Sequence, residues 1–251
     1  SISYIPNIKL LNRWAAGFIQ SGKHDVIVDK NNFLSTNRVL NDNGINGDGV
    51  IVSLFDTGLA YNHPLFSDKN NDVKINQDNF EHRKIVRFDA FEDSTDLKTG
   101  HGTHCGGIIA GLAEDKNSPL NTYRGHAPNS KLYVADIESD KNDYINISSV
   151  GDAIDHAIRL GSQIVSCSWG TDEPEPELST LFDFIAYTVP NLTFVFAAGN
   201  DGNNYKINSP GDSKNVITVG ALSASNEFYL GSDLDISIVN VETNRSEERR
   251  V

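Results

Sequence analysis

Apolar residues in this chain gather in short runs that glycines and polar loops separate. The clearest run, residues 50–55, lies between Gly49 and Gly58 and is typical of a strand buried on both faces. Similar runs predict four further strands. These are residues 131–137, 163–168, 192–197 and 215–219.

Between these strands the apolar positions recur with the period of a helix. Three stretches predict helices, at residues 101–112, 148–160 and about 177–189. The second shows the pattern best, because Val150, Ile154, Ala157 and Ile158 share one face and Gly161 supplies the stop. Strands that alternate with helices predict an α/β fold, with a doubly wound, mostly parallel sheet and helices on both faces.

The chain reads as one domain with a lead-in and a short tail. Residues 1–40 hold an amphipathic stretch around 10–19 and are expected to pack on the domain as a lead-in. Residues 41–243 form the domain itself, without internal repeats. Residues 244–251 form a charged tail that resembles translated sequencing-adapter DNA, so we expect this tail to be non-native.

Composition excludes several classes of function. The 251 residues, 38% of them apolar, are enough for one sizeable core. A net charge of −13 argues against nucleic acid as a partner, because phosphate binding needs a basic face. No apolar run approaches the length of a membrane span. Cys105 and Cys167 are too few for a disulfide framework, so we expect both to be buried and without a disulfide bond. We also expect the protein to be monomeric.

Three short motifs carry candidate chemistry. Asp56 begins Asp-Thr-Gly at the end of the first strand, His101 begins His-Gly-Thr-His at a helix start, and Asn200 ends Ala-Ala-Gly-Asn after a later strand. The carboxyl ends of parallel strands meet at one edge of a sheet, so Asp56 and Asn200 should project toward the same edge. A helix N-terminus disfavours a cation, which helps His101 act as a neutral base. A carboxylate on its other ring nitrogen would fix the tautomer.

Each motif alone has an ordinary interpretation. Asp56 fits a turn, His101 fits a helix cap or a packed histidine, and Asn200 fits a strand-to-turn position. All three in this order, however, resemble the subtilisin-like serine proteases, the subtilase family, and the similarity covers about residues 8–230. The larger multidomain members are the most similar in pattern. The resemblance implies that Asp56 and His101 belong to a catalytic triad and that Asn200 donates to the oxyanion.

The same resemblance implies two substrate-binding segments. Ser168-Trp169-Gly170 stands where the family has Ser-Leu-Gly, which pairs with the substrate backbone, and Ala197-Ala198-Gly199 precedes the amide donor. Trp169 in place of leucine suggests an altered pocket rim. The family further implies polypeptide substrates, a subtilisin-like fold and a secreted or secretory location. It implies no required cofactor; structural calcium would fit the family, but no spacing here identifies a calcium or other metal site.

The nucleophile of the family is missing from the sequence. Its Gly-Thr-Ser turn occurs nowhere, since Gly102-Thr103 and Gly170-Thr171 are not followed by serine. The leading hypothesis is therefore a C-terminally incomplete fragment of a serine endopeptidase whose serine is encoded further on. A second is a catalytically dead protease that binds peptides. A third is a metal hydrolase that uses Asp56, His101 and His104 as ligands.

Three further expectations concern neighbouring residues. We interpret His104 as a packed, hydrogen-bonded histidine, and Cys105 as a buried thiol one helical turn beneath the base. The acidic residues 172–177 read as a solvated loop, with a preference for basic substrate residues as the alternative. If a core helix is missing, an exposed apolar patch should result.

Overall fold

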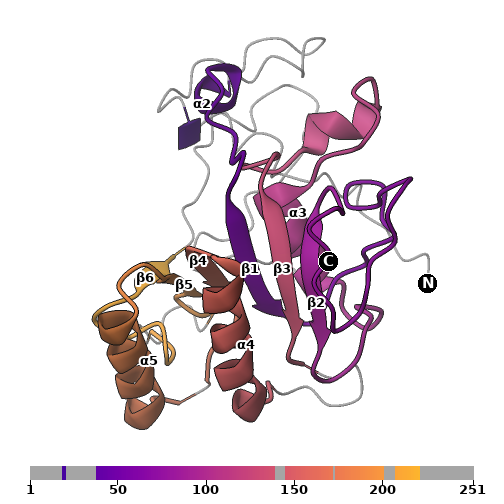
Figure 1. Cartoon of the computed structure of the whole chain (residues 1–251). Coiled ribbons are helices and arrows are strands. Elements are labelled where there is room, and N and C mark those ends of the chain that lie inside the picture. Colours follow the sequence, from indigo (N-terminus) through magenta and orange to yellow (C-terminus); the bar gives the residue numbers. More distant parts are fainter. Residues whose placement is uncertain (1–18, 21–37, 139–144, 172, 201–206, 221–251) are drawn as a thin grey trace, which may run out of the picture.

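A six-stranded sheet forms the centre of the molecule (Figure 1). The computed structural model describes residues 19–20, 38–138, 145–171, 173–200 and 207–220. All neighbouring strands are parallel, in the order β2-β3-β1-β4-β5-β6. The strands are β1 (Ile51–Asp56), β2 (Ile85–Ala90), β3 (Lys131–Asp136), β4 (Ile164–Cys167), β5 (Thr193–Ala197) and β6 (Ile217–Val219).

Helices cover both faces of this sheet, as the sequence predicted. The helical elements are α2 (Val39–Asp42), α3 (His101–Ala110), η1 (Pro119–Tyr123, a 3-10 helix), α4 (Ile147–Leu160) and α5 (Pro176–Thr188). The five predicted strands and three predicted helices are confirmed, with bounds that differ by two residues or fewer. The predicted tail at 244–251, the amphipathic stretch at 10–18 and most of the lead-in lie outside the described residues.

The strand β2 was not predicted. Its residues Ile85, Val86 and Phe88 are buried, but Arg87 interrupts the apolar run. In the structure Arg87 pairs with Asp89 on the same strand, with their charged atoms 2.6 Å apart. The charge of Arg87 is therefore neutralised by a neighbour on the same strand, and β2 continues through this position without a break.

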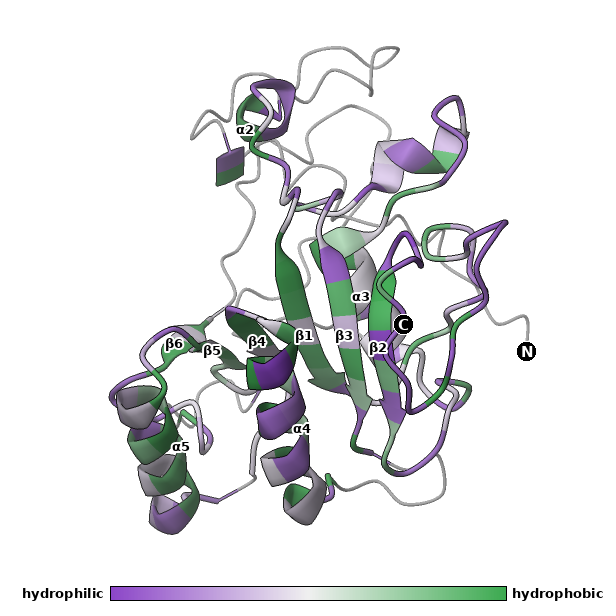
Figure 2. Ribbon diagram, in the orientation of Figure 1, coloured by the Kyte–Doolittle hydropathy of each residue, from purple (hydrophilic) through white to green (hydrophobic). Residues whose placement is uncertain are grey.

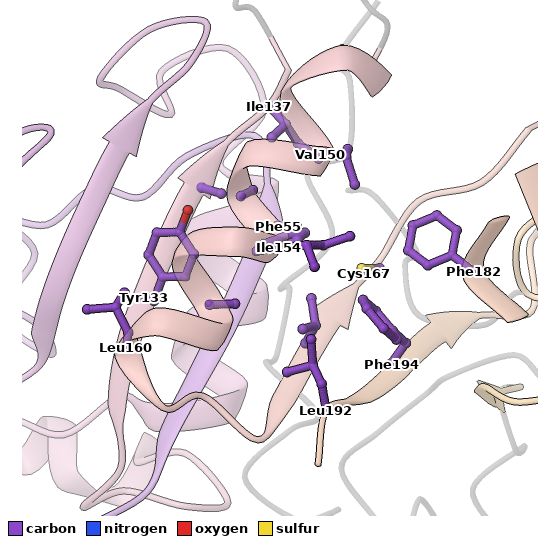
Figure 3. Packing of buried hydrophobic residues seen from close by; sticks show 14 of the residues in the cluster. Phe55, Tyr133, Ile137, Val150, Ile154, Leu160, Cys167, Phe182, Leu192 and Phe194 are labelled. Carbon is purple, nitrogen blue, oxygen red and sulfur yellow. The ribbon is translucent and has the colours of Figure 1, made fainter. Parts of the chain in front are cut away.

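Two hydrophobic cores lie on opposite faces of the sheet. Leu54 of β1 contributes to the core under α3, and the next residue, Phe55, contributes to the core under α4 and α5. Figure 3 shows Val150 and Ile154 of α4 packed toward the sheet, with Phe182 of α5 near Phe194. Figure 2 shows the matching pattern, since the strands are hydrophobic along much of their length and the outer side of α4 is polar.

The bounds of α4 follow from its capping residues. Asn146 accepts a hydrogen bond from the backbone N–H of Ser148 through its side chain, and Gly161 ends the helix in the left-handed conformation at φ 75°. Ile158, which the apolar pattern placed on the buried face, is exposed. The buried face is formed instead by Val150, Ala153, Ile154, Ala157 and Leu160.

Apolar side chains remain exposed on α5 and on the edge strand β6. On α5 these are Leu181, Phe184 and Tyr187, and on β6 they are Ile217 and Val219. The contiguous apolar patch expected if a core helix is missing stays a prediction. Among the described residues, no helix combines the length and the apolar content needed to cross a bilayer.

Candidate active site

A carboxylate and an imidazole meet where β1 ends and α3 begins. Asp56 is the last residue of β1 and is only 2% exposed, and His101 is the first residue of α3. The His101 Nδ1 and the Asp56 Oδ1 atoms are 2.5 Å apart. The structure therefore brings together two residues that lie 45 positions apart in the chain, and it joins them by a direct hydrogen bond.

The two oxygens of Asp56 have different surroundings. Oδ1 also accepts the backbone N–H of Thr57 at 2.8 Å. Oδ2 is buried and has no hydrogen-bond partner among the described residues. The partners that hold the carboxylate are thus gathered on the oxygen that faces His101, which restricts the orientation of the imidazole.

Gly102 allows α3 to approach β1 closely enough for this contact. A Cβ atom at Gly102 would lie 2.1 Å from the carbonyl oxygen of Gly58 and 3.2 Å from the side chain of Asp56. The first distance is far shorter than any van der Waals contact and would force the backbone to move, and the second is tight. The glycine after the histidine is therefore a steric requirement of the pair, in addition to its place in the motif.

A second buried carboxylate, Asp96, lies beside this pair, and the sequence did not single it out. Its Oδ1 accepts the hydroxyl of Thr57 at 2.8 Å, and its Oδ2 accepts the backbone N–H of Thr103 at 2.7 Å. Burial raises the pKa of Asp96, and the nearby Asp56 carboxylate adds to this rise.

The thiol of Cys105 lies beside the base, as expected. Cys105 is buried and forms no disulfide, with its Sγ 3.9 Å from Nδ1 of His101 and 3.5 Å from Oγ of Ser168. Cys167 is also buried and forms no disulfide, and burial raises the pKa of its thiol well above the ordinary value. The interpretation of both cysteines as buried residues without a disulfide is confirmed.

The interpretation of His104 as a packed residue is wrong. His104 is exposed, because three residues after His101 the helix surface has already turned toward solvent. Among the described residues, the acidic, thiol and imidazole groups close enough to share an ion are Asp56, His101 and Cys105, whose ligand atoms lie within 4.8 Å of one another. His104 is outside this group, so the metal-hydrolase hypothesis loses its third ligand.

Asn200 lies at the same sheet edge, in the turn after β5. It is exposed, and Gly199 before it adopts φ 99°, a left-handed conformation that favours glycine. The strand β4 separates β5 from β1. The register aligns Phe55 with Cys167 and Cys167 with Phe196, so the ends of β1 and β5 lie two strand spacings, about 10 Å, apart at this edge.

The segment Ser168-Trp169-Gly170 directly follows β4 and has no regular structure. The Trp169 ring packs edge-on against Phe182 and Phe196, with centroids 6.1 and 5.3 Å apart, and its Nε1 donates to the carbonyl of Phe55 at 3.0 Å. The indole therefore anchors the segment to the core. The altered pocket rim that Trp169 suggests stays a prediction. The roles of Ser168, Gly170 and residues 197–199 in substrate binding stay predictions.

Structural calcium also stays a prediction. In the loop at residues 67–79, the Asp68 carboxylate accepts backbone N–H groups of Asn70 and Arg83, each at 2.8 Å. Burial alone would raise the pKa of Asp68, but these hydrogen bonds outweigh it and lower the pKa to about 2. The carboxylate is thus already held by protein donors.

Comparisons of the sequence with a family profile and with curated proteins both find serine proteases. The family profile described as "Subtilase family" matches residues 47–244. The Serine protease/ABC transporter B family protein tagD of Dictyostelium discoideum is 32% identical over 224 residues, which cover 85% of this chain and 12% of that protein. The major intracellular serine protease of Bacillus subtilis is 30% identical over 203 residues, covering 78% and 59%. An alkaline protease of Alkalihalobacillus alcalophilus is 29% identical over 206 residues, covering 80% and 48%, so the chain spans less than two thirds of each relative.

Proposed function

The chain belongs to the subtilase family, and from this premise we propose that it is part of a serine-type endopeptidase. In this proposal His101 is the general base, Asp56 orients it, and Asn200 donates a hydrogen bond to the oxyanion. Membership of the family supports serine-type peptidase activity in general terms. The observation that carries the assignment of roles is the 2.5 Å contact between the His101 and Asp56 side chains.

The direction of that contact determines how the base would work. Because Nδ1 of His101 is engaged by Asp56, Nε2 is the ring nitrogen that would take the proton of a serine hydroxyl. The serine would then attack the scissile carbonyl, and the imidazolium would pass the proton to the leaving amine. Asp56 would stabilise the imidazolium while it exists. The 251 residues contain no Gly-Thr-Ser, so the proposal assigns the nucleophile to sequence outside them.

Polypeptides are the proposed substrates. The backbone of Ser168–Gly170 and that of Ala197–Gly199 follow neighbouring strands, so an extended peptide could lie between them and place its carbonyl near Asn200. An oxyanion donor of this kind contributes about 2.7–4 kcal/mol, on a scale that comes from subtilisin itself. A secreted location stays a prediction, since one relative is an intracellular protease by name.

Hydrolysis of a fluorogenic peptide tests the proposal. The 251-residue chain should show negligible turnover, and a longer product of the same gene that contains an in-frame Gly-Thr-Ser should be active. In that longer form, Asn200→Ala should lower kcat about 10²–10³-fold. His101→Ala should leave only residual activity, while Asp155→Asn on the exposed side of α4 should change nothing.

Two outcomes would contradict the proposal. Robust turnover by the 251-residue chain, blocked by a serine-directed phosphonate, would show that the nucleophile has been assigned wrongly. A stop codon directly after codon 251 at an intact locus, together with peptide binding without hydrolysis, would support a peptide-binding protein instead.

A further inference from the structure

The start of α3 lacks the usual side-chain cap. The residue before the helix is Gly100, which has no side chain to offer, yet the first backbone N–H groups of a helix need acceptors. Three hydroxyl or carboxylate groups supply them. The N–H of His101 donates to the Thr99 hydroxyl at 3.2 Å, that of Gly102 donates to the Thr57 hydroxyl at 2.9 Å, and that of Thr103 donates to Asp96 at 2.7 Å.

Two of these three acceptors connect the helix to β1. The Thr57 hydroxyl that accepts from Gly102 donates in turn to Asp96 at 2.8 Å. The backbone N–H of the same threonine donates to Oδ1 of Asp56. Asp96 and Thr57 therefore hold the first turn of α3 against the residue that binds the imidazole.

From this network we infer that Asp96 is a positioning residue for His101, acting through Thr57 and the first turn of α3. The inference rests on the proposed function, because it concerns the base that function needs. Asp96 is 6% exposed and touches neither the imidazole nor the proposed substrate segments in any contact described above. Its effect on His101 is to fix where the helix begins relative to Asp56.

A shift of the first turn of α3 would move His101 and so would slow the proposed reaction. A displacement of about 1 Å at a catalytic group can cost about 10²-fold in rate. The helix N-terminus also stabilises the negative charge of Asp96. A neutral replacement would weaken or remove the hydrogen bonds that Asp96 accepts from the Thr103 N–H and the Thr57 hydroxyl. The first turn would then be free to shift, and the Nδ1–Oδ1 contact would lengthen.

The tautomer of His101 provides a direct test in the 251-residue chain. The ¹⁵N shifts of the two ring nitrogens report which of them carries the proton, and no nucleophile is needed for the measurement. In the parent, Nδ1 should be protonated at neutral pH. Asp96→Asn and Asp96→Ala should move a measurable fraction of the proton to Nε2, with the larger change in the alanine variant.

A pair of variants at Thr57 tests the same network without altering charge. Thr57→Val keeps the shape and removes the hydroxyl, so it should reproduce the tautomer shift, while Thr57→Ser should restore the parent spectrum. Ser53→Ala serves as the structural control, because it removes a buried hydrogen bond to Ser162 (2.8 Å) near the other end of β1. This control should lower stability and leave His101 unchanged.

The outcomes separate this inference from the proposed function. If the folded Asp96 and Thr57 variants keep the parent tautomer and only lose stability, as Ser53→Ala does, the inference is overturned. In the longer, serine-containing form, Asp96→Asn should lower kcat about 10–100-fold at unchanged KM. If that form has no activity while His101 still depends on Asp96, the proposed function fails and the positioning role stands.

Discussion

Lys84 is a buried amine, and its replacement gives a direct test of the burial that the structure shows. Its side chain is 2% exposed, and its Nζ donates to the carbonyls of Pro128 at 2.8 Å and Ser130 at 2.6 Å. No ion pair links it to a carboxylate within the part of the chain that the structure describes. Burial lowers the pKa of Lys84 from 10.5 to about 7, and the nearby positive charges of Arg83 and Lys131 contribute to the decrease.

The difference between the pKa of Lys84 in the folded and in the unfolded chain determines whether stability rises or falls with pH. The unfolded chain binds the Lys84 proton up to pH 10.5, but the folded chain binds it only up to about pH 7. Stability should therefore rise with pH between these values, by at most about 1.4 kcal/mol per pH unit, and should stay at its lower level below pH 7. The full gap of 10.5 − 7, about 3.5 units, corresponds to a free energy on the order of 5 kcal/mol.

Urea unfolding at pH 7, 8 and 9 measures this contribution. The free energy of unfolding of the parent, minus that of Lys84→Met, should increase by about 2 kcal/mol from pH 7 to pH 9. The exposed Lys116 gives the matched control, since Lys116→Met should leave the pH dependence of the parent unchanged. A difference between parent and Lys84→Met that stays constant from pH 7 to pH 9 would refute the reasoning.

Three other substitutions have defined outcomes. Gly102→Ala should destabilise the fold by about 2 kcal/mol or more and disturb the His101 ring signals, because its Cβ would meet the carbonyl of Gly58; an unchanged stability and spectrum would contradict the close approach. Phe182→Ala, in the aromatic core, should cost about 3–5 kcal/mol in chemical denaturation, and a cost below about 1 kcal/mol would argue against its burial. Asp89→Ala should cost about 3–5 kcal/mol at neutral pH, because its buried carboxylate binds the Arg87 guanidinium, the Tyr133 hydroxyl and the His156 ring. The Arg87 guanidinium keeps only its more exposed partner, Asp78. A neutral effect would contradict these contacts.

The sequence predicted the fold where one face or both faces of an element carry an unbroken apolar pattern. The strand β1 is such a case, since Val52, Leu54 and Phe55 are all buried and no charge interrupts them before Asp56. The strand β2 was missed because Arg87 and Asp89 look like loop residues until their mutual contact is known. The contact of Asp89 with Arg87, and with His156 of α4 (2.6 Å), depends on tertiary structure, which periodicity does not contain.

The candidate site was predictable in part. The motifs identified Asp56 and His101 as candidates, because an acid at a strand end and a histidine at a helix start are local features of sequence. The distance between them is not local, since it depends on how α3 packs on β1. Asp96 was missed because it is one of several acids in a loop, although the bare glycine cap at Gly100 was a signal that the helix must find acceptors elsewhere.

The directions of side chains were the least predictable feature. The indole of Trp169 packs edge-on against Phe182 and Phe196, a contact that the sequence did not indicate. His104 was expected to pack, but it faces solvent. In both cases the spacing in the sequence is compatible with either direction, and the choice is made by neighbours that come from distant parts of the chain.

The glycines of α3 explain why one short helix can both carry a base and cover a core. Gly102 faces the end of β1, and one turn later Gly106 faces Leu54 and Leu59, where an added Cβ would lie 2.9 Å from the Leu59 side chain. The helix therefore touches the sheet with its backbone over its first two turns. A helix held this closely has little freedom to rotate, so the imidazole of His101 is positioned by packing as well as by hydrogen bonds. We therefore expect larger residues at either glycine to displace the imidazole before they unfold the domain, because the strain falls first on the contact between α3 and β1.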